Sequence, residues 1–242
     1  MSRKLLLCLT YAGGTRSFFG DIRADLTPEM EVVRYDYPGH GSRVKEPLPD
    51  TISAAAEDIY EKFLAEYGDA INTGQAEYGI IGYSMGSIVA YELIRQIGTK
   101  GELKMPIHAF LAAHEPETRS VYGDIPEDIQ DVDEYIKMRT IEFGGVPESL
   151  VDNATYWRIY MPLYKADYKM IGDYDFEAAN WSCQVPATVF YSEEDKGREA
   201  MLPWRKYFTD KCNLVEYTGK HFFINEYHQD MAQVIKREMG CR

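Results

Sequence analysis

Residues 79–87 read GIIGYSMGS and place one serine, Ser84, between Gly82 and Gly86 after a short apolar run. A serine held at a sharp turn from a buried strand into a helix needs small neighbours, because strand and helix nearly touch there. The residues before the turn are strand-like, and residues 87–98 (SIVAYELIRQIG) carry apolar side chains at helical spacing. The segment therefore predicts a strand–turn–helix unit with Ser84 at its tip.

Length, composition and charge limit the domain organisation and the kinds of partner that this chain can have. The chain has 242 residues, of which 45% are hydrophobic, and this suits a single domain over residues 1–242 with a full core. Its 26 basic and 39 acidic residues give a net charge of −13. That charge repels both a nucleic-acid backbone and an anionic membrane surface, so we expect neither as a partner.

The first residues, MSRKLLLCLTYAGG, carry the basic start of a signal peptide, but their apolar run is shorter than the roughly 7–15 residues such a segment needs. No later run approaches the roughly 20 apolar residues of a membrane span. The four cysteines have neither CxxC spacing nor the density of a disulfide scaffold, and the histidines lack metal-ligand spacing. We therefore expect a cytoplasmic protein without a metal site.

Short apolar runs alternate with helical patterns along the chain. The expected strands are residues 4–9, 31–37, 77–83, 107–113, 187–192 and 212–217. Residues 53–68 and 87–98 are expected to be helices, with Gly68 and Gly98 at their ends. Strands that alternate with helices predict an α/β fold with a mostly parallel, doubly wound sheet.

The alternation breaks at about residues 115–180, which we interpret as an inserted helical lid over the sheet. Residues 131–143 predict one helix, begun by Asp131, and residues 153–171 a second helix, bent at Pro162. The segment holds 15 acidic and six basic residues, so it carries nine of the 13 net negative charges.

Four tyrosines repeat at four-residue spacing along the second of these helices: Tyr156, Tyr160, Tyr164 and Tyr168. Such a stripe either lines a substrate pocket or packs the helix against its neighbours, and packing is the commoner use.

A serine hydroxyl is a poor nucleophile until a base takes its proton, so a histidine and an orienting carboxylate are required. In folds with this elbow the chain order is serine, acid, histidine. That order excludes His40 and His114, while His108 begins a strand and suits a buried structural role. His228 lies in an amphipathic helix, where we expect a solvated side chain. His221, in the loop TGKHFFINEY, is the remaining candidate base.

The acid is expected at the carboxyl edge of the sheet, after the strand ATVFYS. Glu193, Glu194 and Asp195 all follow that strand, and Asp195 is favoured because it lies farthest into the loop. Glu115 is the rival, because an acid after the preceding strand reaches the same histidine in some versions of this fold.

The oxyanion of acyl transfer needs two N–H donors. One comes from the residue after the nucleophile, Met85, and the other from the loop after an early strand. The segment LTYAGGTRSFF (9–19) is the candidate loop, because its paired glycines let backbone N–H groups face the site. Ala12 is the expected donor, within one residue.

Together these residues resemble the type II thioesterases that accompany nonribosomal peptide and polyketide synthases, which have the α/β-hydrolase fold. The resemblance covers nearly the whole chain and rests on the order and spacing of several motifs. They are YAGG (11–14), DYPGHGSR (36–43) with EPL (46–48), GYSMGSIVAYEL (82–93), FGGVPESL (143–150), MPLYKADYKMIGDYDF (161–176), YSEEDKG (191–197) and GKHFF (219–223).

Carried over residue by residue, the resemblance implies Ser84 as nucleophile, Asp195 as acid and His221 as base, with Met85 and the neighbourhood of Ala12 as oxyanion donors. It thereby supports Asp195 over Glu115. The chain departs from the family at four places: Thr10 and Tyr11 before AGG, Tyr83 before the serine, Lys220 before the histidine, and a strand that ends in AAHEP. We expect Tyr11, Gly13 and Tyr83 to contribute to substrate binding.

The implied function is hydrolysis of acyl groups from the phosphopantetheine thiol of acyl- or peptidyl-carrier domains, with small acyl groups as substrates and no cofactor. Arg16, Arg43 and Lys45 lie in loops at the expected active-site edge and are predicted to help dock the acidic carrier. The alternatives are a general carboxylesterase or acyl-CoA thioesterase, and a non-catalytic interaction protein with a hydrolase fold.

Overall fold

A computed structural model describes residues 2–116 and 129–241. Its centre is a parallel sheet of six strands in the order β2-β1-β3-β4-β5-β6. The strands are β1 (Arg3–Leu9), β2 (Glu31–Arg34), β3 (Ala76–Tyr83), β4 (His108–Ala112), β5 (Ala187–Ser192) and β6 (Cys212–Tyr217). The central strands are buried along nearly their whole length, which explains their continuous apolar sequences.

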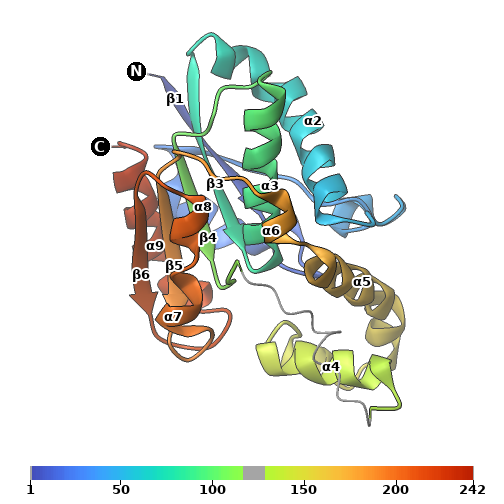
Figure 1. Ribbon diagram of the computed structural model, residues 1–242. Helices are drawn as coiled ribbons and strands as arrows, with labels where there is room; N and C mark the ends of the chain where they lie inside the picture. The colour runs from blue at the N-terminus through green and yellow to red at the C-terminus, as the bar shows by residue number, and fades with distance from the viewer. Residues whose placement is uncertain (1, 117–128, 242) are drawn as a thin grey trace.

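Helices cover both faces of the sheet (Figure 1), and β1 shows why. Its side chains alternate: Leu5 and Leu7 face a core shared with α2 (Ile52–Asn72) and α3 (Met85–Lys100). Leu6 and Cys8 face a second core built with α1 (Gly20–Leu26) and α9 (Ile224–Glu238). The predicted doubly wound α/β fold is therefore confirmed.

Two predicted helix ends are wrong. Gly68 lies inside α2, which continues until Thr73 caps it, because Ile71 extends the buried face by another turn. Gly98 lies inside α3, which ends at Gly101. Gly101 has a φ of 69°, the left-handed conformation that a glycine cap adopts, so it and not Gly98 ends the helix.

The predicted strand 31–37 is also too long, since β2 ends at Arg34. Beyond it, Asp36 leaves the sheet and accepts hydrogen bonds from the backbone N–H groups of Arg16 and Ser42, at 2.7 and 2.9 Å. Side-chain bonding to two loops replaces strand pairing there.

The segment between β4 and β5 contains α4 (Val132–Phe143), the 3₁₀ turn η3 (Glu148–Leu150), α5 (Ala154–Asp173) and α6 (Phe176–Ala179). As predicted, Asp131 caps the first of these helices by accepting from the N–H groups of Asp133 and Glu134. Helix α5 runs through Pro162 without ending. Residues 117–128 of the predicted insertion lie outside the described residues.

Helices α4 and α5 lie beyond the carboxyl ends of the strands, whereas both chain termini lie at the opposite edge of the sheet (Figure 1). The remaining short helices are η1 (Arg16–Phe19), η2 (Gly41–Arg43), α7 (Gly197–Met201) and α8 (Trp204–Tyr207). None of the helices in the described ranges has the length and apolar character required to cross a bilayer.

Candidate active site

Ser84 lies in a strained turn between β3 and α3, as the sequence predicts. Its φ of 54° and ψ of −121° lie outside the conformations an ordinary residue adopts at a helix start. A Cβ at Gly82 would lie 2.1 Å from the carbonyl oxygen of Gly86, and a Cβ at Gly86 would lie 2.0 Å from that of Leu9. Only glycine fits at either position.

Ser87 holds this turn in place, a role that the sequence reading missed. Its buried hydroxyl lies 2.9 Å from the carbonyl oxygens of both Gly82 and Ala112, and it accepts the Ala112 N–H at 3.0 Å. The N–H of Ser84 also donates to the Ala112 carbonyl, at 2.8 Å. The start of α3 is thus tied to the ends of both β3 and β4.

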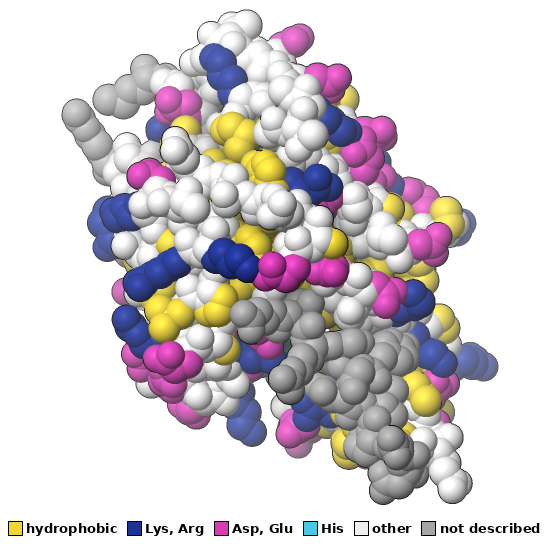
Figure 2. All heavy atoms as spheres, viewed as in Figure 1, with side chains coloured by type: hydrophobic (Ala, Val, Ile, Leu, Met, Phe, Trp, Pro, Cys, Tyr) yellow, Lys and Arg dark blue, Asp and Glu magenta, His cyan; other side chains and the backbone are white. Residues whose placement is uncertain are grey.

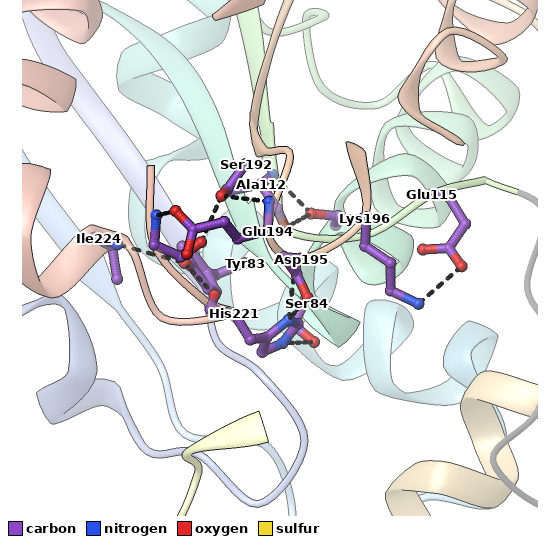
Figure 3. A network of polar contacts seen from close by, with 12 residues as sticks. Tyr83, Ser84, Ala112, Glu115, Ser192, Glu194, Asp195, Lys196, His221 and Ile224 are labelled. Carbon is purple, nitrogen blue, oxygen red and sulfur yellow. Dashed lines mark hydrogen bonds and ion pairs between the residues drawn. The ribbon is translucent and has the colours of Figure 1, made fainter. Parts of the chain in front are cut away.

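The loops after β5 and β6 bring an acid and a histidine to this serine (Figure 3). The Nε2 atom of His221 lies 3.0 Å from the Oγ atom of Ser84. The Nδ1 atom of the same ring lies 3.1 and 3.0 Å from the two carboxylate oxygens of Asp195. Since a carboxylate only accepts, Nδ1–H donates to Asp195, and the lone pair of Nε2 faces the serine hydroxyl.

The other predicted acids have different partners. Glu194 accepts the Gly219 N–H at 2.8 Å and so joins the loop of the acid to the loop of the histidine. Glu193 accepts the Arg198 N–H at 3.0 Å. Glu115 pairs with Lys196, whose Nζ lies 3.0 Å from its Oε1 (Figure 3). Asp195 is therefore the carboxylate that the structure places at His221.

A cavity of about 70 Å³ opens beside Ser84 and His221. Apolar side chains form much of its wall: Phe143, Ile171 and Phe222. Tyr11 and Ala12 line it from the loop after β1, and burial, followed by the nearby hydroxyls of Tyr156 and Tyr160, raises the pKa of Tyr11 to about 12. The hydroxyl of Tyr11 therefore stays neutral at physiological pH.

The three predicted substrate contacts have different surroundings in the structure. Tyr83 is completely buried, and its hydroxyl donates to the carbonyl oxygen of His221 at 2.7 Å, so it supports the histidine loop from behind. The backbone of Gly13 faces helix α5, because a Cβ there would lie 2.2 Å from the Tyr164 ring. Tyr11 alone of the three lines the cavity with Ser84.

The two predicted oxyanion donors both lie close to the serine. Met85 follows Ser84 as the first residue of α3 and is fully buried, and Ala12 lines the same cavity as Ser84. The close approach of Gly86 to Leu9 brings the start of α3 against the beginning of the Ala12 loop.

Known proteins show the same architecture. The family model of the thioesterase domain matches residues 4–238. The chain belongs to the thioesterase family.

The thioesterase is 27% identical over 241 residues to the gramicidin S biosynthesis protein GrsT of Aneurinibacillus migulanus, an alignment covering 97% of this chain and 88% of that protein. It is 25% identical to the medium-chain S-acyl fatty acid synthase thioesterase of Homo sapiens, covering 90% and 80%.

Two solved structures are also similar. ClbQ, from the colibactin NRPS/PKS pathway, superposes with a TM-score of 0.84 at 25% identity over 99% of this chain and 98% of that one. RedJ, a thioesterase from the prodiginine pathway of Streptomyces coelicolor, gives a TM-score of 0.81 at 26% identity, covering 98% and 86%. The family and these neighbours make the protein a thioester-hydrolysing enzyme of the α/β-hydrolase type.

The histidines outside the cavity have structural partners. His108 is buried as predicted and lies 2.9 Å from the hydroxyl of Thr188. His228 is only partly solvated, because its side chain is 25% exposed and its Nδ1 lies 2.5 Å from a carboxylate oxygen of Asp25. His40 is buried against Asp167 of α5, a contact between residues far apart in sequence that no local pattern indicated.

The tyrosine stripe of the thioesterase is mainly packing. Tyr156 and Tyr160 stack with ring centroids 4.5 Å apart, and the hydroxyls of Tyr156 and Tyr164 lie 2.7 Å apart. Only Tyr168 of the four lines the cavity, and its hydroxyl lies 2.9 Å from that of Thr140.

The predicted basic cluster does not form a free docking patch. Arg43 is largely buried by ion pairs with Asp58 and Glu46, and Arg16 is more exposed but lies 3.7 Å from Asp36. Lys45 is exposed. On the face seen in Figure 2, basic and acidic side chains are interspersed over the surface.

Proposed function

We propose that this thioesterase hydrolyses short acyl groups from the phosphopantetheine thiol of acyl- or peptidyl-carrier domains in nonribosomal peptide or polyketide synthesis. The observation that supports it best is the contact between Ser84 Oγ and His221 Nε2 at a small, apolar-walled cavity. The similarity to GrsT and ClbQ supports the biosynthetic setting. The proposal places the enzyme in the cytoplasm with the synthase.

In the first step, the Oγ atom of Ser84 attacks the carbonyl carbon of the thioester while Nε2 of His221 takes its proton. The carbonyl oxygen becomes an oxyanion, which accepts hydrogen bonds from the N–H groups of Met85 and Ala12. The C–S bond then breaks, the acyl group stays on Ser84, and the departing pantetheine thiolate takes the proton from His221. Asp195 holds Nδ1–H throughout and stabilises the imidazolium.

In the second step, water attacks the acyl-serine while His221 takes one of its protons. A second oxyanion forms and collapses, Ser84 recovers its proton from His221, and the free carboxylic acid leaves. Because a thiol has a reference pKa near 8.5, the thiolate leaves with less proton assistance than an alkoxide. Oxyanion stabilisation and hydrolysis of the acyl-enzyme therefore control the rate. Side chains and backbone groups suffice, so the proposal includes no cofactor.

The cavity supports a preference for short acyl groups. The cavity is small, at about 70 Å³, and Phe143 and Ile171 present apolar surface to an acyl chain. A long chain needs these walls to move.

Intact-mass spectrometry tests the proposal. Wild-type enzyme and Ser84→Ala are incubated with an acetyl-phosphopantetheine carrier protein, and parallel reactions contain a lauroyl carrier, acetyl-CoA and nitrophenyl acetate. We expect rapid loss of acetyl from the carrier, slower loss of lauroyl, and no loss with Ser84→Ala.

Three outcomes would redirect the proposal. Turnover of acetyl-CoA and nitrophenyl acetate with the carrier untouched would indicate a general thioesterase or esterase. Faster loss of lauroyl than of acetyl would overturn the short-chain preference. Full activity in Ser84→Ala would remove Ser84 as nucleophile.

A further inference from the structure

A second buried pair of histidine and carboxylate lies behind the loop that carries Ala12. The Nε2 atom of His40 is 2.8 Å from Oδ2 of Asp167, and both side chains are 0% exposed. The same oxygen of Asp167 accepts the backbone N–H of Gly13 at 2.6 Å. One carboxylate oxygen on α5 thus joins the loop after β1 to the loop after β2.

The hydrogen bonds of His40 favour a charged pair. Nδ1 of His40 lies 2.9 Å from the carbonyl oxygen of Pro38, which only accepts, while Nε2 faces a carboxylate. With Asp167 ionised, both ring nitrogens carry protons. Burial alone lowers the pKa of His40, but the hydrogen bond and charge of Asp167 outweigh it and raise the pKa.

Stability alone does not explain such a pair. The desolvation of two buried charges often equals their attraction, so apolar residues of similar volume would stabilise the fold as well. The other oxygen of Asp167, Oδ1, is buried without a hydrogen-bond partner among the described residues. Burial of the Asp167 carboxylate therefore costs desolvation free energy. Its position beside Gly13 points to a role in positioning the loop that carries Ala12.

The Gly13 N–H belongs to the peptide bond that directly follows Ala12, so its direction sets the orientation of Ala12. Gly13 has a φ of 76°, and the Gly14 N–H closes a turn onto the carbonyl oxygen of Tyr11 at 2.9 Å. Tyr164, three residues before Asp167 on α5, packs against Gly13 on the same side. Helix α5 therefore contacts the loop after β1 through the ring of Tyr164 and the carboxylate of Asp167.

We propose that Asp167 is a positioning residue for thioester hydrolysis. From helix α5 it anchors the Gly13 peptide and so aims the Ala12 N–H at the oxyanion, while His40 holds the carboxylate charged and oriented. The inference rests on the proposed role of Ala12 as an oxyanion donor. It makes the inserted helices part of the catalytic apparatus, beyond their role as walls of the cavity.

The test compares Asp167→Ala and Asp167→Asn with wild-type enzyme on the acetyl thioester of N-acetylcysteamine and on nitrophenyl acetate. We expect Asp167→Ala to lower kcat by about 10- to 100-fold, with KM within about threefold, because the lost interaction serves the transition state. The inhibition constant of a methyl trifluoromethyl ketone, whose serine adduct places an oxyanion in the site, should rise by a similar factor. Asp167→Asn keeps an oxygen for the Gly13 N–H and should recover part of the loss.

Glu92→Gln is the matched control. Glu92 is a buried carboxylate on α3 that accepts from the hydroxyl of Tyr174, just after α5, at 2.9 Å. Its loss should lower the Tm while leaving kcat within about threefold, because it does not touch the Ala12 loop. If Asp167→Ala does not fold, His40→Gln and Asp167→Asn carry the comparison.

Unchanged kcat in Asp167→Ala would overturn the inference, and so would an unmoved inhibition constant or an equal loss of kcat in Glu92→Gln. Should the wild-type enzyme leave carrier thioesters untouched yet hydrolyse nitrophenyl acetate, the proposed function fails while the role of Asp167 is still decided on the ester. The two failures are therefore distinguishable.

Discussion

The sheet and the helices inserted between β4 and β5 are held in different ways. Strands β1 and β3 pair over seven consecutive positions through backbone hydrogen bonds, and helices bury both faces of the sheet. Helix α5 and the residue that follows it contact the body through side chains: Asp167 accepts from the Gly13 N–H, and Tyr174 donates to Glu92. The difference teaches that the nucleophile and base are carried by the ends and loops of the paired sheet, whereas oxyanion geometry and acyl fit depend also on side-chain contacts that a single substitution can alter.

The largest effect is expected in the loops of the sheet. Asp195→Asn should lower kcat by about 10³–10⁴-fold, because an amide no longer holds the His221 tautomer whose Nε2 accepts the serine proton. The fold should keep its Tm within a few degrees, since the substitution preserves the shape of the side chain. Steady-state kinetics on an acetyl thioester and thermal unfolding measure both.

Glu115→Gln is the control for this substitution, because Glu115 pairs with Lys196 and not with His221. We expect kcat within about fivefold of wild type. The reverse ranking of the two variants would reassign the acid to Glu115.

An alanine substitution in the turn around Ser84 should destabilise the fold more than the same substitution at an exposed glycine. Gly86→Ala forces a Cβ to within 2.0 Å of the Leu9 carbonyl oxygen, a backbone atom that cannot move without the strand. We expect a loss of about 3 kcal/mol or more in the free energy of unfolding. Gly20→Ala is the control, since a Cβ there meets nothing within 4 Å and the residue has helical φ and ψ. Urea unfolding that shows equal stability in the two variants would contradict this account of the elbow.

The sequence predicted the parts of the molecule that local patterns determine. The apolar runs located all six strands, and the glycines around Ser84 predicted the elbow that the structure contains. Chain order and the resemblance selected His221 and Asp195, and the structure places His221 at Ser84 and Asp195 at His221. Helix ends were less certain, since Gly98 ends a helix only if its backbone turns left-handed, and tertiary packing decides that.

Contacts between residues far apart in the chain could not be predicted from local sequence patterns. His40 was correctly excluded from the serine–acid–histidine order, but nothing local links it to Asp167, which follows 127 residues later. Tyr83 was expected to contribute to substrate binding because it departs from the family pattern before the serine, yet side chains alternate along a strand and Tyr83 points into the core beneath the histidine loop. Burial of this kind depends on the assembled sheet.

The buried residues His108 and His40 should contribute to folding stability with opposite dependences on pH. Burial lowers the pKa of His108, on β4, to about 4, so the unfolded state binds its proton more tightly and stability is lost as pH falls from about 6.5 toward 4. Burial lowers the pKa of His40, but the hydrogen bond and charge of Asp167 outweigh burial, so the pKa is raised. Its contribution is fully present below about pH 6.5 and is lost as pH rises through the folded-state pKa.

Urea unfolding at pH 5, 7 and 9 measures both terms. We expect His108→Gln to remove a loss of about 2 kcal/mol between pH 7 and 5, and His40→Gln to flatten the decline above pH 7. An unchanged slope on the acid side in His108→Gln would mean that another group titrates there. An unchanged alkaline slope in His40→Gln would mean that His40 is neutral and the pair with Asp167 uncharged.

The smallest effects separate packing from substrate contact within α5. Tyr156→Phe removes the hydroxyl that lies 2.7 Å from that of Tyr164, and Tyr168→Phe removes the one 2.9 Å from Thr140. Each should lower the free energy of unfolding by about 1 kcal/mol, the net value of one hydrogen bond. Only Tyr168 lines the cavity, so only Tyr168→Phe should change the ratio of kcat/KM between acetyl and lauroyl thioesters. An altered ratio in Tyr156→Phe would extend the acyl site along the stripe, and an unaltered ratio in both would leave all four tyrosines to packing.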